Sequence, residues 1–155
     1  MSKRLAVVIA AVAALGIAGA AYADAGDLSH PVTIRTIQKG GNQEFLTLNP
    51  TRGDSTGNQF VISGPLFRAG TQHRIGSIRG FCVVTTKVFG IGQCDFTAQF
   101  SAGSVTVSGP LNFTPGKTDV LAVTGGTGHF RNARGQVVAQ NTGRTSEGLT
   151  FELIP

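Results

Sequence analysis

The chain has 155 residues, among them 22 Gly and 10 Phe, with no Trp, one Tyr and a formal net charge of +5. Only 14% of the residues are charged, which excludes a highly charged disordered chain and a long coiled coil. The Gly content argues against a mainly helical fold, because each Gly costs about 1 kcal/mol relative to Ala inside a helix but is used freely in turns. We therefore expect one domain of short strands and tight turns.

The first 23 residues are expected to be a secretory signal peptide. Lys3 and Arg4 form a basic start, residues 5–21 are apolar, and residues 21–23 form a small-x-small cleavage site. An uncleaved membrane anchor is the alternative, but this apolar run is shorter than the roughly 20 residues that span a bilayer. The sequence thus predicts cleavage after Ala23, a secreted or periplasmic protein, and no transmembrane anchor after cleavage.

A polar segment at 24–30, expected to be flexible, precedes a region in which apolar residues recur with a period of two. This alternation predicts strands, and their spacing favours an antiparallel barrel or sandwich over residues 31–155. Because small barrels either fill with side chains or hold one small ligand, the nature of the interior is the functional question. The predicted strands are 32–37, 44–48, 59–67, 78–86, 94–100, 104–108, 120–124, 135–140 and 149–153, with turn signals at Gly40-Gly41, Gly53, Gly64-Pro65, Gly103, Gly109-Pro110 and Pro115-Gly116.

The two cysteines, Cys82 and Cys94, are expected to form a disulfide, because an even number of cysteines in an exported chain favours pairing. If the intervening turn is centred on Val88, the two residues face each other across a hairpin at a distance that a disulfide can bridge. A turn centred on residues 90–92 would instead leave them out of step. The sequence favours the first register and leaves the second open.

Several other motifs favour a structural interpretation. Residues 125–128 look like a nucleotide-binding glycine loop, but Arg131 stands where a third glycine is expected and strands follow, so a tight turn is predicted. His30, His73 and His129 lack metal-ligand spacing, and no metal or cofactor site is predicted. The arginines are spread along the chain without interleaved aromatic residues, so no nucleic-acid partner is expected.

Residues from about Gly57 to Leu153 resemble the allene oxide cyclase and dirigent barrel superfamily. The segment 125–135 is similar to the dirigent signature of a Gly-Gly-Thr-Gly turn followed by Phe-Arg and Ala-Arg-Gly. Segments 74–76, 80–84, 103–110 and 121–126 are similar to cyclase strands. The resemblance implies an all-β, calycin-like, eight-stranded antiparallel barrel with an apolar cavity, and a homotrimer. The signature residues are Gly125, Gly126, Thr127, Gly128, Phe130, Arg131, Ala133, Arg134 and Gly135.

The resemblance also implies where chemistry would take place. Plant cyclases rearrange a fatty-acid epoxide with the help of a buried carboxylate on an early strand, for which Glu44 is the candidate here. Dirigents carry an Arg in a Gly-Arg-Ala-Gln-Gly segment that is similar to residues 76–80, where the Arg position falls on Ser77 and Arg79 is displaced. The residues expected to line the interior are Arg79, Phe81, Phe96, Phe100 and Phe130.

The leading functional hypothesis is an exported barrel that binds a small hydrophobic or phenolic ligand and steers its cyclisation or coupling. Orienting a reactive substrate can accelerate ring closure without acid-base chemistry. The alternatives are an isomerase of the cyclase type that uses Glu44, and a non-catalytic structural or envelope-interaction barrel filled by phenylalanines. A buried Glu44 with a raised pKa would favour the isomerase, and an exposed Glu44 would argue against it.

Overall fold

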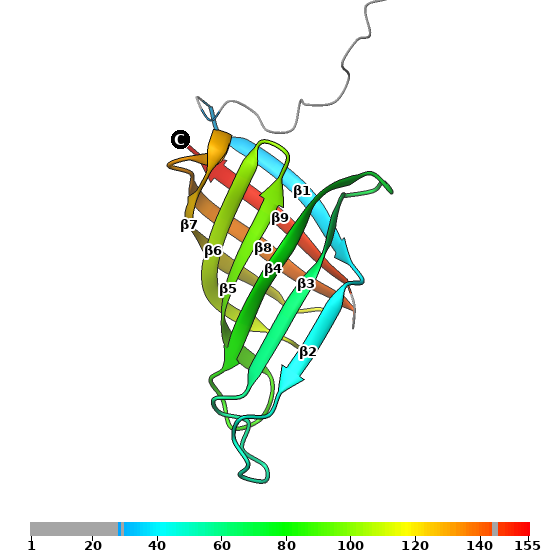
Figure 1. The fold of residues 1–155 in the computed structure, drawn as a ribbon, viewed down its shortest axis with the longest axis vertical. Helices are drawn as coiled ribbons and strands as arrows, with labels where there is room; N and C mark the ends of the chain where they lie inside the picture. Colours follow the sequence, from blue (N-terminus) through cyan, green and yellow to red (C-terminus); the bar gives the residue numbers. More distant parts are fainter. Residues whose placement is uncertain (1–27, 29, 144–145) are drawn as a thin grey trace, which may run out of the picture.

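The computed structural model describes residues 28, 30–143 and 146–155, so the predicted signal peptide and most of the segment 24–30 lie outside the described residues. None of the described helices is long and apolar enough to span a bilayer. The described chain forms nine strands and one short 3-10 helix (Figure 1). They are β1 (Val32–Lys39), β2 (Asn42–Leu46), β3 (Gln59–Arg68), β4 (Arg74–Val84), β5 (Ile91–Phe100), β6 (Gly103–Asn112), β7 (Thr118–Gly126), η1 (Gly128–Phe130), β8 (Arg134–Gly143) and β9 (Ser146–Ile154).

The strands form one antiparallel sheet that closes on itself. Each strand from β3 to β9 pairs with its neighbour in the sequence, and β1 pairs with both β9 and β3. This double pairing of β1 closes an eight-stranded antiparallel barrel, while β2 pairs only with β3 and is a ninth, additional strand. The predicted fold class is therefore confirmed.

A glycine pair separates β1 from β2 and places β2 outside the closed barrel. Gly40 and Gly41 have φ angles of 66° and 103°, and a side chain at Gly41 would collide with the backbone of Ser63. The chain bends there, leaves β9 and continues along β3. We call the barrel end at which β1 ends and β9 begins the mouth, and the opposite end the base.

Two predicted turns are wrong, because Gly64-Pro65 lies within β3 and Gly109-Pro110 lies within β6. Pro lacks an N–H group and usually interrupts a ladder of strand hydrogen bonds. Pro65, however, lies where β3 changes partner from β2 to β1, and Pro110 lies beyond Ser108, the last residue of β6 paired with β7. Each proline thus occupies a place where one ladder is already interrupted.

The base of the barrel is closed by the signature segment. Its first three glycines form the end of β7 and the start of η1, with Gly128 at a φ of 61°, as expected for a tight turn. Phe130 in η1 is fully buried, and its ring lies 5.6 Å from that of Phe100, which in turn lies 5.6 Å from the ring of Phe151. The signature segment therefore fills the core at the base of the barrel with the side chain of Phe130.

The predicted disulfide is confirmed. Cys82 on β4 is paired in register with Cys94 on β5, and their sulfur atoms are bonded. This register centres the hairpin on Val88 and excludes the alternative centre at residues 90–92. Both cysteines are completely buried. A disulfide suggests an oxidising, exported environment.

Candidate functional site

The alternation of side chains along β4 decides which residues face the barrel interior. Ile78 and Cys82 are buried. Arg79 and Phe81, which lie between them in the strand, are exposed, and the exposed fraction of Phe81 is 44%. Successive side chains of a strand point to opposite faces of the sheet, so Arg79 and Phe81 lie on the outer face. The predicted interior position of these two residues is corrected on this basis.

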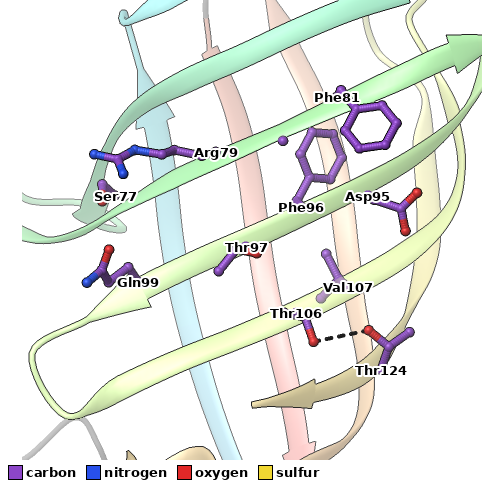
Figure 2. A pocket seen from close by; sticks show the side chains of 11 residues that line it. Ser77, Arg79, Phe81, Asp95, Phe96, Thr97, Gln99, Thr106, Val107 and Thr124 are labelled. Carbon is purple, nitrogen blue, oxygen red and sulfur yellow. Dashed lines mark hydrogen bonds between the residues drawn. The ribbon is translucent and has the colours of Figure 1, made fainter. Parts of the chain in front are cut away.

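Arg79 and Phe81 instead border a hollow of about 510 Å³ on the outside of β4, β5, β6 and β7 (Figure 2). Phe81 is directly opposite Asp95 in the sheet, and Arg79 is opposite Thr97. Thr124 donates a hydrogen bond of 3.1 Å to the hydroxyl of Thr106 at its far side. The hollow is thus a solvent-facing surface of mixed polar and aromatic character. Its lining residues are Ser77, Arg79, Gly80, Phe81, Asp95, Phe96, Thr97, Gln99, Thr106, Val107 and Thr124.

The other three predicted phenylalanines do belong to the interior. Phe96 and Phe130 are buried, and Phe100 is partly buried against the core. None of them borders the cavity at the mouth described next. They fill the part of the barrel nearer the base.

A cavity of about 410 Å³ opens at the mouth. This volume lies within the range of pockets that hold small organic molecules. Phe113 is central to its aromatic wall, because its ring is stacked on Phe89 at 5.1 Å and lies 5.8 Å from Phe60. The cavity therefore offers a planar apolar surface. It is lined by Gln38, Gln43, Phe60, Ile62, Phe89, Leu111, Phe113, Pro115, Asn141, Gly143, Ser146 and Glu147.

Three polar residues form a row across adjacent strands of the same cavity. Glu147 on β9 is directly opposite Gln38 on β1 and directly opposite Asn141 on β8. Opposed residues of an antiparallel pair have Cβ atoms roughly 5 Å apart. The Glu147 carboxyl group is thus flanked by two amides in a cavity that is also lined by apolar side chains such as Phe60, Ile62 and Leu111.

The environment of Glu147 favours its protonated form. Burial raises the pKa of this carboxyl group from 4.5 to about 7, and the negative charge of Asp119 adds to the shift. A neutral carboxylic acid avoids the cost of burying a charge without a partner. Among the described residues no hydrogen bond or ion pair to the Glu147 side chain is found. Near neutral pH this group is therefore able to donate or accept a proton.

Backbone contacts hold the polar groups around Glu147 in place. Asp119 Oδ2 accepts a hydrogen bond from the Asn112 amide at 2.7 Å, and Asn141 donates one to the Phe113 carbonyl at 3.0 Å. Gln38, only 3% exposed, donates a hydrogen bond to the Gly40 carbonyl. The site is therefore built on strands and fixed by main-chain groups, as an organised binding site requires.

Gly64 makes room for the buried Gln38 side chain. A Cβ atom at Gly64 would lie 2.6 Å from Gln38 Nε2, closer than real Cβ atoms approach other heavy atoms. The absence of a side chain at this inward position of β3 is thus what allows an amide to occupy the barrel wall.

Glu44, the carboxylate candidate from the resemblance, lies on β2, in which every residue is exposed. Its strand leaves the barrel at the glycine pair, so Glu44 pairs with Val61 outside the closed sheet. This position removes the burial on which its proposed role depended. The carboxyl group in the cavity belongs to Glu147, the second residue of β9.

Sequence reasoning missed Glu147, Phe60, Phe89 and Phe113. One signal was available for Phe60, because it alternates with Ile62 in a predicted strand. Phe89 and Phe113 lie in loops, where periodicity carries no information. In the described part of the chain, no group of three or more His, Cys, Asp or Glu side chains is arranged to hold a metal ion.

By its geometry the molecule belongs to the class of small closed β-barrels with a cavity open at one end. Its sequence matches the family model described as "Dirigent-like protein" over residues 31–153, and the chain is therefore a member of the dirigent-like protein family. No curated protein gives a significant match to the sequence.

Several solved structures have a similar fold. A pyocyanin demethylase has a TM-score of 0.68 at 21% sequence identity, covering 79% of this chain and 99% of that one. The pterocarpan synthase dirigent protein PsPTS1 has a TM-score of 0.65 at 16% identity, with coverage of 81% and 95%. AbnU, an exo-specific intermolecular Diels-Alderase, has a TM-score of 0.64 at 13% identity, with coverage of 80% and 96%. At these identities the similarity concerns the fold.

Proposed function

We propose that this protein is exported, binds a small hydrophobic or phenolic ligand in the mouth cavity, and steers the cyclisation or coupling of that ligand. One observation carries the proposal: the same cavity holds the aromatic wall of Phe60, Phe89 and Phe113 and the protonatable carboxyl group of Glu147. Apolar cavities with a few convergent polar groups and a perturbed pKa are typical of binding and catalytic sites.

The cavity would act on its ligand in two ways. The flat surface of Phe89 and Phe113 would orient a planar ring, which reduces the entropic cost of bringing reacting atoms together. Because its pKa is about 7, Glu147 populates both protonation states at neutral pH, and it would donate a proton to a carbonyl oxygen or accept one from a phenol. Gln38 and Asn141 on either side would hydrogen-bond polar atoms of the ligand.

The similar structures support this class of reaction. A pterocarpan synthase and a Diels-Alderase share the fold, and the names of both denote enzymes that form rings. A heme-binding cyclase that catalyses a [4 + 2] cycloaddition also has this fold, with a TM-score of 0.62 at 14% identity. A barrel of this kind is thus a suitable scaffold for guiding ring formation.

Export and assembly are part of the proposal. We expect the signal peptide to be removed after Ala23, so that the intact mass of the exported protein corresponds to a chain beginning at Asp24. The homotrimer follows only from the resemblance to the superfamily, and sedimentation velocity of the exported protein measures it directly. A single-chain sedimentation coefficient would end the trimer proposal without affecting the cavity.

Replacing Phe113 by Ala is expected to weaken the binding of N-phenyl-1-naphthylamine, a neutral aromatic fluorophore, by about tenfold, because one stacked wall of the cavity is lost. Fluorescence titration measures the affinity. Phe81→Ala is the matched control, since this exposed ring lies on the outer face, and its affinity should equal that of the wild type. If the wild type takes up no fluorophore, the non-catalytic, filled barrel becomes the better description.

A further inference from the structure

Large apolar side chains gather at the tip of the mouth. The described residues include ten large apolar side chains that are substantially exposed. Six of these ten belong to the segments 45–48 and 88–91. The two segments touch, because the rings of Phe45 and Phe89 lie 5.2 Å apart in an edge-to-face arrangement. We call Phe45, Leu46, Leu48, Val88, Phe89 and Ile91 the mouth patch. Exposed apolar patches of this kind mark sites of interaction.

The loops that carry the mouth patch are held together by specific hydrogen bonds. The side-chain oxygen of Asn58, a buried residue, accepts bonds of 2.8 Å from the amides of both Leu48 and Asn49. Ser55 donates an amide hydrogen bond of 2.7 Å to the carbonyl of Lys87, which links the β2–β3 loop to the β4–β5 loop. Val88, 78% exposed, and Leu48, 58% exposed, are thus carried outward on braced loops.

The two loops lie together at one end of the long axis of the molecule, where the β2–β3 loop reaches furthest (Figure 1). Phe89 belongs both to the mouth patch and to the wall of the cavity. The patch is therefore continuous with the cavity entrance, and a surface that covers the patch also meets the entrance.

Basic residues exceed acidic ones on the exterior of the mouth. Arg52 and Lys87 lie on the loops of the patch and are balanced by Glu44 and Asp54, whereas Lys39 at the end of β1 and Lys117 before β7 add two positive charges on the rest of the mouth. Asp119 and Glu147, at the same end, interact with each other at the cavity. Hydrogen bonds from Thr56 lower the pKa of Asp54, which is therefore ionised at neutral pH. The exterior of the mouth still carries a net positive charge. An apolar tip on a basic mouth matches the chemistry of an anionic lipid surface.

We propose that the mouth patch docks on an anionic phospholipid bilayer, with Leu48 and Val88 entering the headgroup region. A second copy of this chain fits less well, because two positively charged rims would face each other. Docking in this orientation brings the cavity entrance against the membrane, so that an apolar ligand passes between lipid and barrel without crossing water.

The test uses co-sedimentation of the exported protein with vesicles of phosphatidylcholine, alone or mixed with phosphatidylglycerol, at low salt. The double variant Leu48→Asp/Val88→Asp is expected to bind mixed vesicles at least about tenfold more weakly. Lys87→Glu should lower binding to mixed vesicles about fivefold and leave the weaker binding to phosphatidylcholine unchanged. Val120→Asp is the matched control, because Val120 is 53% exposed on β7 and lies outside the patch, and it should bind as the wild type does.

The proposal is overturned if the wild-type protein stays in the supernatant with both lipid mixtures, or if Val120→Asp loses as much binding as the double variant. It is also overturned if sedimentation velocity shows that the double variant dissociates an oligomer, since the patch then covers a second copy. Uptake of N-phenyl-1-naphthylamine by the double variant is measured in parallel. Retained uptake shows that the variant is folded and separates membrane docking from ligand binding in the cavity.

Discussion

The free energy of unfolding is expected to fall by at least roughly 3 kcal/mol when Cys82 and Cys94 are both replaced by Ala. The bond closes a loop with a sequence separation of 12 residues, and the chain-entropy model assigns about this value to a loop of that size. Both side chains are completely buried, so the smaller alanines also remove packing contacts and add to the loss.

Urea denaturation of three samples separates these contributions. The oxidised wild type, the reduced wild type and the double Ala variant are compared, because reduction breaks the covalent link and keeps both sulfur atoms. We expect most of the loss already in the reduced wild type. If the reduced and oxidised proteins unfold at the same urea concentration, the entropic account of this disulfide is wrong.

Replacing Glu147 by Gln is expected to change the pH dependence of stability. The folded protein holds the pKa of Glu147 at about 7, against 4.5 as the ordinary value, so between these pH values the folded state binds more protons than the unfolded state. Wild-type stability therefore decreases as the pH rises through this window. Gln is neutral at every pH, so the variant should be more stable than the wild type above pH 7, by about 3 kcal/mol, which is the size that a pKa shift from 4.5 to about 7 corresponds to.

Glu44→Gln serves as the control for this prediction, because Glu44 is exposed on β2. Its stability curve should run parallel to that of the wild type from pH 4 to pH 8, a range set by the two pKa values of Glu147. A wild-type curve that does not fall between pH 4.5 and 7 would show that Glu147 is ionised in the folded protein.

The same variant tests the chemical role of Glu147. For any ligand that the protein converts, Glu147→Gln should lower the rate about 100-fold, the smaller end of the range for acid-base catalysis. Binding of N-phenyl-1-naphthylamine should be unchanged, because Gln keeps the shape of the side chain. An unchanged rate would mean that the cavity acts through orientation alone.

The fold was largely predictable because the alternation of apolar and polar residues is a local signal. In residues 94–100 the alternate side chains Cys94, Phe96 and Ala98 are buried and Phe100 is partly buried, as the pattern indicated, and the cysteine spacing agreed with the register of the β4–β5 hairpin. Prolines were misread for a physical reason. Pro65 and Pro110 signal turns by their chemistry, but a strand tolerates proline where a neighbouring strand begins or ends.

The candidate site was less predictable because it depends on long-range pairing. Phe81 and Phe96 both lie in predicted strands, yet only Phe96 occupies a position whose side chain points into the barrel. Glu147 precedes the predicted strand 149–153, and it is partly buried because β1 and β8 flank it. Glu44 was favoured by its position on an early strand, and two glycines remove that strand from the barrel.

The pairing of β1 with β9 joins the two ends of the domain. A chain that emerges from a ribosome or a translocation pore with its N-terminus first cannot satisfy the hydrogen bonds of β1 on that side until its final residues have appeared. The hairpin of β4 and β5, which is local, can form and oxidise much earlier. Loss of the last strand would therefore leave an open sheet with two unprotected edges, a state prone to aggregation.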